Sequence, residues 1–516
     1  MEQFIKKNIN IILAIFILIQ PIIDLLTGLC LHVFNINFTV GIIIRIMFLF
    51  FISIITLFTF KKKKILIPYF IIGIYFIFYI IGVLLFKNNN LFQELQGLIK
   101  VFYFPILFIS LYSIKDEIRI SSLTLLTTLF LYLFLIFIPL ILGIGFKSYE
   151  ITKAGTLGFF NSANEISGII SLLTPVMLIV FITSKKIIPI LIFSIIYLVV
   201  ILMVGTKTPL LSLGITLIMA ILYFWNYSFK EKKYKNIIIS FILIIISVLS
   251  LIIIIPKTNF YKNIKTHLDY LKLDNITEVF TDKELIDHFI FSQRLTFLEK
   301  KSTIYNKAPL YQQLFGIGYI NNKKVTKLIE IDYFDILYSH GIIGFIIYFS
   351  LVIYIIYKVL NKAKKLNFET QMFHTSFLLI IILSFFTGHI ITAPSVSLLV
   401  VIIILSLIEK SKKDLLFASK FLNIGGIEIA QVNLLNSLDY NKYNVTLILE
   451  EKKGSLLSKL NENVKVKELK VSNCKITVLR KIINLSRQIT FKIFNYHNYD
   501  FSCCYTTYSY SCNKIA

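Results

Sequence analysis

The chain has 516 residues, of which 57% are hydrophobic and only 16% are charged. Soluble domains carry about 25% charged residues, so this composition excludes an ordinary set of soluble domains and is typical of a membrane protein. The formal net charge of +25 would suit a nucleic-acid binder. No nucleic-acid-binding motif accompanies it, however, and the lysines separate apolar runs as topology signals do, so no nucleic-acid partner is expected.

Runs of about 20 apolar residues predict membrane spans, because a helix of that length crosses the hydrocarbon core. The sequence predicts about twelve such spans, so the fold class is an α-helical polytopic membrane protein. The first run is not a cleavable signal peptide, because Pro21 and Asp24 interrupt it and no small-residue cleavage site follows. The predicted spans are centred near residues 20, 50, 75, 104, 132, 172, 195, 217, 245, 346, 379 and 400.

Positive charge predicts the orientation of these spans. Clusters of lysine and arginine fall in every second connection, and cytoplasmic loops are enriched in both residues. We therefore expect a multi-pass protein of the cytoplasmic membrane with both termini in the cytoplasm. The clusters are Lys6–Lys7, Lys61–Lys64, Lys115 with Arg119, Lys185–Lys186, Lys230–Lys235, Lys358–Lys365 and Lys410–Lys413.

One connection stands apart from the others by its length. Residues 256–334 form a polar, aromatic-rich segment on the predicted outer side, within a membrane domain of residues 1–410. Loops of this length are usually functional or disordered, and the aromatics favour short helices lying over the outer surface. Residues 411–516 contain no span, and we expect a cytoplasmic tail whose first strand, helix and second strand begin a βαβ unit.

Few arginines occur in this chain, and two of them are candidates for function. Arg45 lies inside the second span, where a charge by default marks a functional or paired site, and Asp24 is the expected partner of a purely structural pair. Arg294 lies in the long loop. Lysine serves almost everywhere else as a generic positive charge, whereas a guanidinium offers a planar fork matched to phosphate. Lys100, near the outer start of the fourth span, is expected to extend its ammonium to the surface.

Three further segments place polar residues at the outer ends of spans. They are residues 158–165, residues 205–209 with Lys207, and residues 330–335, which lead to His340. Each is also compatible with a capped helix end, for which Asn161 or Asp332 would serve. Taken together with Arg294, they predict cations and carboxylates on one outer face. That combination suits a reaction on a phosphate-linked lipid, in which cations hold the leaving diphosphate and a carboxylate takes a proton from an attacking hydroxyl.

Metal and cofactor chemistry finds no support in the sequence. The seven histidines show no i, i+4 pair, and Cys503, Cys504 and Cys512 lack histidines at zinc spacing. We expect no metal and no cofactor. His340 is the most interesting histidine because it lies at the outer end of a span near the carboxylates.

Over about residues 10–408 the chain resembles the O-antigen ligase and polysaccharide polymerase superfamily. The order of the motifs around a long outer loop carries the resemblance. The motifs are Gln20-Pro-Ile-Ile-Asp24, Gly158-Phe-Phe-Asn-Ser-Ala-Asn164, Gly205-Thr-Lys-Thr208, Arg294, Pro309-Leu310, Phe315-Gly-Ile-Gly318, Glu330-Ile-Asp-Tyr-Phe-Asp-Ile-Leu337 and Gly341-Ile-Ile-Gly344.

The resemblance implies a metal-independent, GT-C-like glycosyltransferase. It implies transfer of a glycan from undecaprenyl diphosphate to an acceptor hydroxyl outside the membrane, with membrane lipid and other polysaccharide-assembly proteins as partners. Arg294 matches a family arginine implicated in holding the diphosphate, and Lys207 stands where an arginine is common. The ligase branch commonly carries a His-Asn pair where this chain has Glu330-Ile331, so the resemblance leaves Glu330 or Asp332 as the base.

The predicted catalytic residues are therefore Arg294, Glu330 and Asp332. Further side chains are predicted to bind the substrate. They are Lys207, Asn161, Asn164, Arg45 and His340.

The tail resembles the N-terminal lobe of family 4 GT-B glycosyltransferases. Residues 414–428 with Gly425-Gly426, then residues 433–438 and 443–449, carry this likeness. The second, nucleotide-binding lobe is missing, so we expect an incomplete Rossmann-like lobe without transferase activity. A truncated or frameshifted fusion and a cytoplasmic docking module are both open.

Two other functions remain as alternatives to a polymerase or ligase. A lipid-linked oligosaccharide flippase also uses about twelve spans with buried charges, but commonly shows two similar halves and no long outer loop. A non-catalytic scaffold is the third alternative. Sugar identity, linkage and acceptor are not encoded in any recognisable motif.

Overall fold

The computed structural model shows a mostly helical protein that separates into two compact units, Met1–Glu409 and Lys410–Ala516. Each unit is described by itself. The structure describes residues 2–34, 40–86, 91–148, 155–184, 186–232, 256, 259–321, 324–325, 328–361, 367–408, 413–440 and 443–468.

Ten helices among the described residues are long and apolar enough to cross a membrane, and each coincides with a predicted span. The polytopic helical fold is therefore confirmed. The span predicted near residue 400 is a shorter apolar helix, and the span predicted near residue 245 lies outside the described residues. The ten are α1 (Glu2–His32), α2 (Val40–Ile54, extended by η1, Ile55–Thr59), α3 (Leu66–Phe86, preceded by η2, Lys63–Ile65), α4 (Leu91–Ser113), α5 (Ser122–Ile141), α6 (Ala163–Thr183), α7 (Ile187–Val204), α8 (Lys207–Lys230), α14 (Asp332–Leu360) and α15 (Phe368–Phe386).

The helix bundle has a buried centre and an apolar exterior. The shorter helix α16 (Pro394–Leu407) is buried along nearly its whole length and packs against α4, α6 and α15. Helices at the edge instead expose large apolar side chains, such as Ile67 and Phe70 of α3. This distribution is what a lipid environment requires, because lipid tails solvate apolar surface that water would not.

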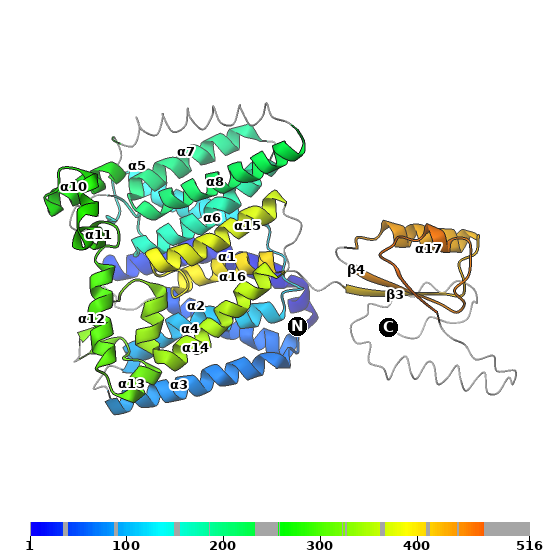
Figure 1. The fold of residues 1–516 in the computed structure, drawn as a ribbon, viewed down its shortest axis with the longest axis horizontal. Helices are drawn as coiled ribbons and strands as arrows, with labels where there is room; N and C mark the ends of the chain where they lie inside the picture. The colour runs from blue at the N-terminus through cyan, green and yellow to red at the C-terminus, as the bar shows by residue number, and fades with distance from the viewer. Residues whose placement is uncertain are drawn as a thin grey trace. The chain divides into compact units, whose positions relative to one another are not determined.

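The long predicted loop consists of short helices, as the sequence predicts. Figure 1 shows the loop helices α10, α11, α12 and α13 following one another along one end of the helix bundle. Two short antiparallel strands follow them before α14 begins. The elements are α10 (Asn259–Leu271), η4 (Ile276–Thr281), α11 (Lys283–Phe289), α12 (Arg294–Asn306), α13 (Leu310–Phe315), β1 (Ile320–Asn321) and β2 (Lys324–Val325).

Two glycines allow the loop backbone to pass directly against α14. Gly341 interrupts the helix with φ of 70°, and a Cβ at this position would clash with the carbonyl oxygen of Leu314. Gly316 has φ of 100°, and a Cβ there would clash with the carbonyl oxygen of Ser339. Both conformations favour glycine, which lacks a Cβ. The crossing fixes the end of the loop to the point where α14 enters the bundle.

The second unit contains the predicted βαβ unit. Strand β3 (Lys413–Ser419) pairs in parallel with β4 (Tyr443–Leu449), and β4 pairs in parallel with β5 (Lys465–Glu468). Helix α17 (Gly426–Ser437) forms the crossover between β3 and β4, and η5 (Leu457–Lys459) precedes β5. A separate apolar core joins the sheet to the helix. Residues 469–516 lie outside the described part of the chain.

Candidate functional site

The turn between α11 and α12 fixes the position of Arg294. Asp287 accepts the backbone N–H groups of Leu295 and Thr296 at 2.8 and 2.9 Å, and the Thr296 hydroxyl at 2.7 Å. A carboxylate at this position satisfies donors that the first turn of a helix leaves without partners, and it suits the positive end of the helix dipole. Arg294 is the first residue of α12, so its side chain starts from a rigid base.

Arg294 is buried and held from several sides. Its Nη1 donates to the carbonyl oxygen of Phe386 at 2.7 Å, and its Nη2 donates to Glu330 Oε2 at 2.9 Å and to the carbonyl oxygen of Thr387 at 3.4 Å. Its Nε is buried and has no hydrogen-bond partner among the described residues. The exposed fraction of the residue is 8%, so this is not a solvated surface charge. A guanidinium that is buried opposite a carboxylate is held in a fixed position, as in a preorganised site.

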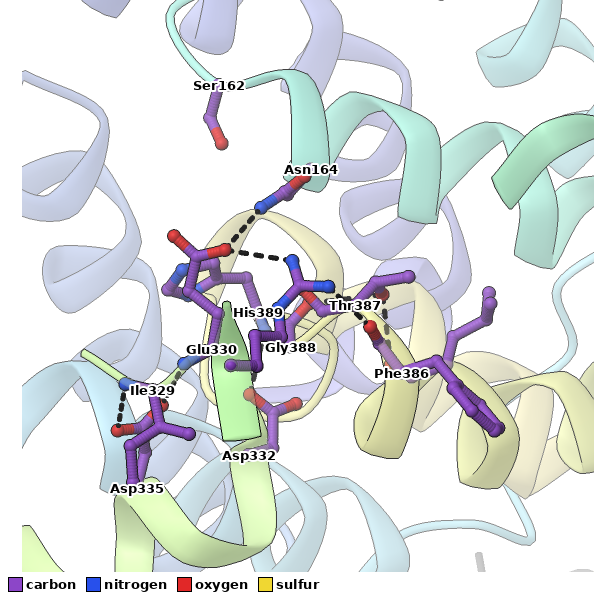
Figure 2. Close-up of polar contacts among 12 residues, drawn as sticks. Ser162, Asn164, Ile329, Glu330, Asp332, Asp335, Phe386, Thr387, Gly388 and His389 are labelled. Atoms are coloured by element: carbon purple, nitrogen blue, oxygen red, sulfur yellow. Dashed lines mark hydrogen bonds and ion pairs between the residues drawn. The ribbon is translucent and has the colours of Figure 1, made fainter. Parts of the chain in front are cut away.

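Glu330 stands opposite Arg294 in an unusual backbone conformation. Its φ is 63°, a left-handed value that costs a residue with a Cβ about 1–2 kcal/mol. Figure 2 shows its carboxylate turned toward Asn164, whose Nδ2 donates to Oε2 at 3.3 Å. The other oxygen, Oε1, has no hydrogen-bond partner in the part of the chain that the structure describes. A residue with a strained backbone and one free carboxylate oxygen points to a functional role.

A second ion pair holds the strained segment in place. Asp335 accepts the backbone N–H groups of Ile329 at 2.9 Å and Glu330 at 2.8 Å. Its carboxylate also receives Lys301 Nζ at 3.2 Å, and Lys301 donates further to the Ser339 hydroxyl at 3.1 Å. Lys301 is only 5% exposed. The Lys301–Asp335 pair therefore connects α12 to the start of α14 and sets the position of Glu330.

Asp332, predicted as a candidate base, has a carboxylate that is fully hydrogen-bonded in the structure, which favours Glu330 for that role. Its carboxylate accepts the backbone N–H groups of residues 389–391 at 2.7 to 3.0 Å and the Thr392 hydroxyl at 2.6 Å. It is 1% exposed. The segment between α15 and α16 is not helical, and backbone polar groups at membrane depth need internal partners. Asp332 supplies them, so it anchors the connection that follows Phe386, the last residue of α15, and begins at Thr387.

Lys207 contacts the loop helices, although the residue remains exposed. Its Nζ donates to the carbonyl oxygen of Phe289 at 2.5 Å and lies 4.3 Å from the centre of the Phe289 ring. It also interacts electrostatically with Arg294, so both predicted cations lie in one region. The Phe289 ring also stacks on His267, with 5.1 Å between the ring centroids. Burial, with smaller contributions from Lys207 and His288, lowers the pKa of His267, so this histidine is neutral near pH 7.

A polar cavity of about 190 Å³ lies next to the Arg294–Glu330 pair. Asp335, which holds the Glu330 backbone, lines it, and so does His389, which follows the Gly388 packed on Glu330. The residues that line the cavity come from α1, α2, α4, α14, the start of α6, the start of α16 and the segments that precede α6, α14 and α16. Its polar lining includes Asp24, Thr27, Arg45, Lys100, Asn161, Ser162, Glu165, Tyr319, Asp335, His389, Thr392 and Ser395.

The predicted Asp24–Arg45 pair is confirmed. Arg45 Nη2 lies 2.5 Å from Asp24 Oδ1, and its Nε donates to Gln20 Oε1 at 2.9 Å. The Tyr132 hydroxyl donates to the second Asp24 oxygen at 2.6 Å. Asn161, predicted to bind substrate, also lines the cavity and pairs with His32 at 2.7 Å. The helix cap expected of Asn161 comes instead from its neighbour Ser162, whose hydroxyl accepts the Glu165 N–H.

His340, predicted to bind substrate, is not among the residues that line the cavity. It is fully buried at the break in α14 and contacts the hydroxyl groups of Tyr319 at 2.7 Å and Tyr75 at 3.2 Å. Burial, with the charges of Asp335 and Glu94, raises the pKa of Tyr319 well above its ordinary value, so its hydroxyl keeps its proton. Tyr319 lines the cavity and His340 does not, so His340 positions Tyr319.

The arrangement can stabilise an anion and accept a proton in one place. Two cations, one carboxylate with a free oxygen and an adjacent polar cavity are the groups that transfer from a diphosphate leaving group needs. Among the described residues, no group of three or more His, Cys, Asp and Glu side chains could hold a metal ion.

The fold and site define a polytopic helical membrane protein whose polar centre is closed at one end by a helical loop. A family model described as O-antigen ligase like membrane protein matches residues 6–278 and 272–414. The chain belongs to this family, whose membership indicates a membrane-embedded ligase or polymerase acting on lipid-linked glycans. No curated protein matches the chain. The match ends at the start of the C-terminal unit, so the likeness of residues 414–516 to a family 4 transferase is not confirmed.

Proposed function

We propose that this protein transfers a glycan from undecaprenyl diphosphate to an acceptor hydroxyl on the outer face of the cytoplasmic membrane. It acts as a polymerase or ligase in the assembly of capsular polysaccharide, exopolysaccharide or another cell-surface glycan. The observation that carries the proposal is the buried Arg294–Glu330 pair, with Asn164 on the same carboxylate and Lys207 nearby. The family match supports the same class of reaction.

In the proposed mechanism, the ion pair is the resting form of the site. The diphosphate of the donor lipid competes with Glu330 for the Arg294 guanidinium, because it carries more negative charge and matches the same fork. Its binding releases the Glu330 carboxylate from Arg294. The freed carboxylate, still near Asn164, becomes the acceptor for a proton.

The chemical step then needs only groups of this chain. The acceptor oxygen attacks the anomeric carbon of the donor sugar while the bond from that carbon to the diphosphate oxygen breaks. The hydroxyl proton passes to Glu330, and undecaprenyl diphosphate leaves with its developing charge held by Arg294 and Lys207. No step requires a metal ion, because side-chain cations stabilise the leaving group.

The C-terminal unit has no part in this scheme. Its three parallel strands and one crossover helix form a core of their own, and none of the proposed catalytic residues lies within it. We infer that residues 410–516 are dispensable for glycan transfer.

The proposal is tested with purified protein in proteoliposomes and lipid-linked glycan extracted from a strain that lacks the gene. Transfer is followed by the appearance of longer or acceptor-linked glycan and by the release of undecaprenyl diphosphate. We expect both products with the natural protein and neither with Glu330→Gln. Equal product formation by Glu330→Gln would remove Glu330 from the mechanism.

A further inference from the structure

The cavity beside Glu330 has both polar and apolar side chains in its lining, and its charges are nearly balanced. Arg45 is paired with Asp24 at 2.5 Å, and Asp335 is paired with Lys301 at 3.2 Å. The two remaining charges of its lining are Lys100, from α4, and the Glu165 carboxylate, from α6. Lys100 interacts electrostatically with Glu165, so these two are opposite charges within one cavity.

Lys100 differs from Arg45 and Lys301 in that it interacts with its neighbouring carboxylate, Glu165, without a direct ion pair. It makes no hydrogen bond and no ion pair with any residue that the structure describes. Glu165 accepts a short hydrogen bond from the Ser395 hydroxyl, which leaves acceptor capacity on its carboxylate. A charged side chain in a span is costly unless it pairs or faces water, and by default it marks a functional site. Lys100 is among the residues that line the cavity.

The chemistry of the lining selects among ligands. A diphosphate would meet the carboxylates of Asp24, Glu165 and Asp335, which repel it. A sugar ring is uncharged, and each of its hydroxyl groups both donates and accepts hydrogen bonds, so it matches a lining of ammonium, carboxylate and hydroxyl groups. Tyr319 and Phe160 add aromatic rings to the lining, and such rings pack against the apolar face of a sugar. The volume of about 190 Å³ corresponds to a single ring rather than a long chain.

We propose that this cavity is the sugar subsite of the protein, with Lys100 and Glu165 as the residues that determine its specificity. It binds one sugar ring of the transferred or the accepting glycan, while the diphosphate stays with Arg294 and Lys207. This inference rests on the proposed function, and it divides the substrate between two sites that are separated by the Glu330 segment.

The test compares two ligand classes on purified protein in nanodiscs. The sugar probes are the glycan freed by mild acid from the lipid-linked pool of the deletion strain, and the glycan solubilised from its cell envelope. The second class is undecaprenyl diphosphate without glycan. Lys100→Met and Glu165→Gln should bind one sugar probe about 10- to 100-fold more weakly than the natural protein, because a charged hydrogen bond is lost. They should bind undecaprenyl diphosphate within about twofold of the natural protein, and the sugar probe that responds identifies the source of the ring.

Thermal unfolding separates a ligand contact from a structural role. Removing an ammonium that makes no direct hydrogen bond or ion pair with the described residues should leave Lys100→Met as stable as the natural protein, or more stable. Lys64→Met removes an exposed lysine of the same charge from the α2–α3 connection and should change neither binding nor stability.

The outcomes distinguish this inference from the proposed function. If neither sugar probe binds the natural protein, or both variants bind the sugar normally, the sugar subsite is wrong even where transfer occurs. If the variants lose undecaprenyl diphosphate binding instead, the cavity is a diphosphate site and the inference fails. Sugar binding that depends on Lys100 in a protein without transfer activity would uphold the subsite and refute the proposed function.

Discussion

Replacement of Glu330 separates its chemical role from its structural one. Glu330→Gln keeps the size of the side chain and an oxygen that can still accept from Arg294 and Asn164, but it cannot take a proton. General base catalysis contributes about 10²- to 10⁴-fold, so glycan transfer should fall by that range. The free energy of unfolding should fall by about 1 kcal/mol, because the Glu330 side chain is 32% exposed and solvent screens part of the ion pair.

Glu330→Gly provides the internal comparison. Glycine relieves the strain of φ 63°, about 1–2 kcal/mol, while the lost charged hydrogen bond costs a similar amount. The stability of this variant should therefore lie within about 1 kcal/mol of the natural protein, and its activity should be as low as that of Glu330→Gln. The assay is the initial rate of transfer in proteoliposomes, with the unfolding temperature measured on the same preparations. Activity of Glu330→Gln above one tenth of the natural rate would refute the reasoning.

Four further outcomes follow from the same structure. Arg294→Lys keeps the charge but loses the fork, so transfer should fall about 100- to 1,000-fold, nearly as far as in Arg294→Ala, and full activity in the lysine variant would exclude a role in holding the diphosphate. Asp332→Asn should destabilise the protein by about 3–5 kcal/mol in thermal unfolding, because buried N–H groups lose a charged acceptor, and an unchanged unfolding temperature would contradict the anchor role. Cysteines placed at Lys272 and Lys64 in a cysteine-free background should react with impermeant reagent from outside and from inside respectively, and the reverse result would overturn the topology. Removal of residues 410–516 should preserve transfer, and a stable truncated protein without activity would show that the second unit is required.

Much of the fold could be predicted because its signals are local. A run of 20 apolar residues specifies a spanning helix by itself. In the same way, the order of a strand, a helix and a second strand predicts the β3–α17–β4 unit. The Asp24–Arg45 pair was also predictable, since an intramembrane charge needs an opposite charge at similar depth and few candidates exist.

The site depended on contacts between distant segments, and sequence alone placed its residues only on the same face. Arg294 and Glu330 are 36 residues apart, and nothing local predicts that they form a pair. The partners of Asp332 could not be predicted, because they lie 57 to 60 residues further along the chain, in a segment whose unusual backbone has no sequence signature. Lys301 was missed as an ordinary loop lysine. The available signal was that two aspartates, Asp332 and Asp335, follow Lys301 at the start of the next span.

The most direct test of the central claim is transfer from a purified lipid-linked glycan by the protein alone. Proteoliposomes that hold the natural protein and the extracted donor lipid should release undecaprenyl diphosphate and form a new glycosidic bond, and Arg294→Ala should do neither. Movement of the intact lipid-linked glycan across the bilayer without any bond being formed would contradict the account and identify the protein as a flippase.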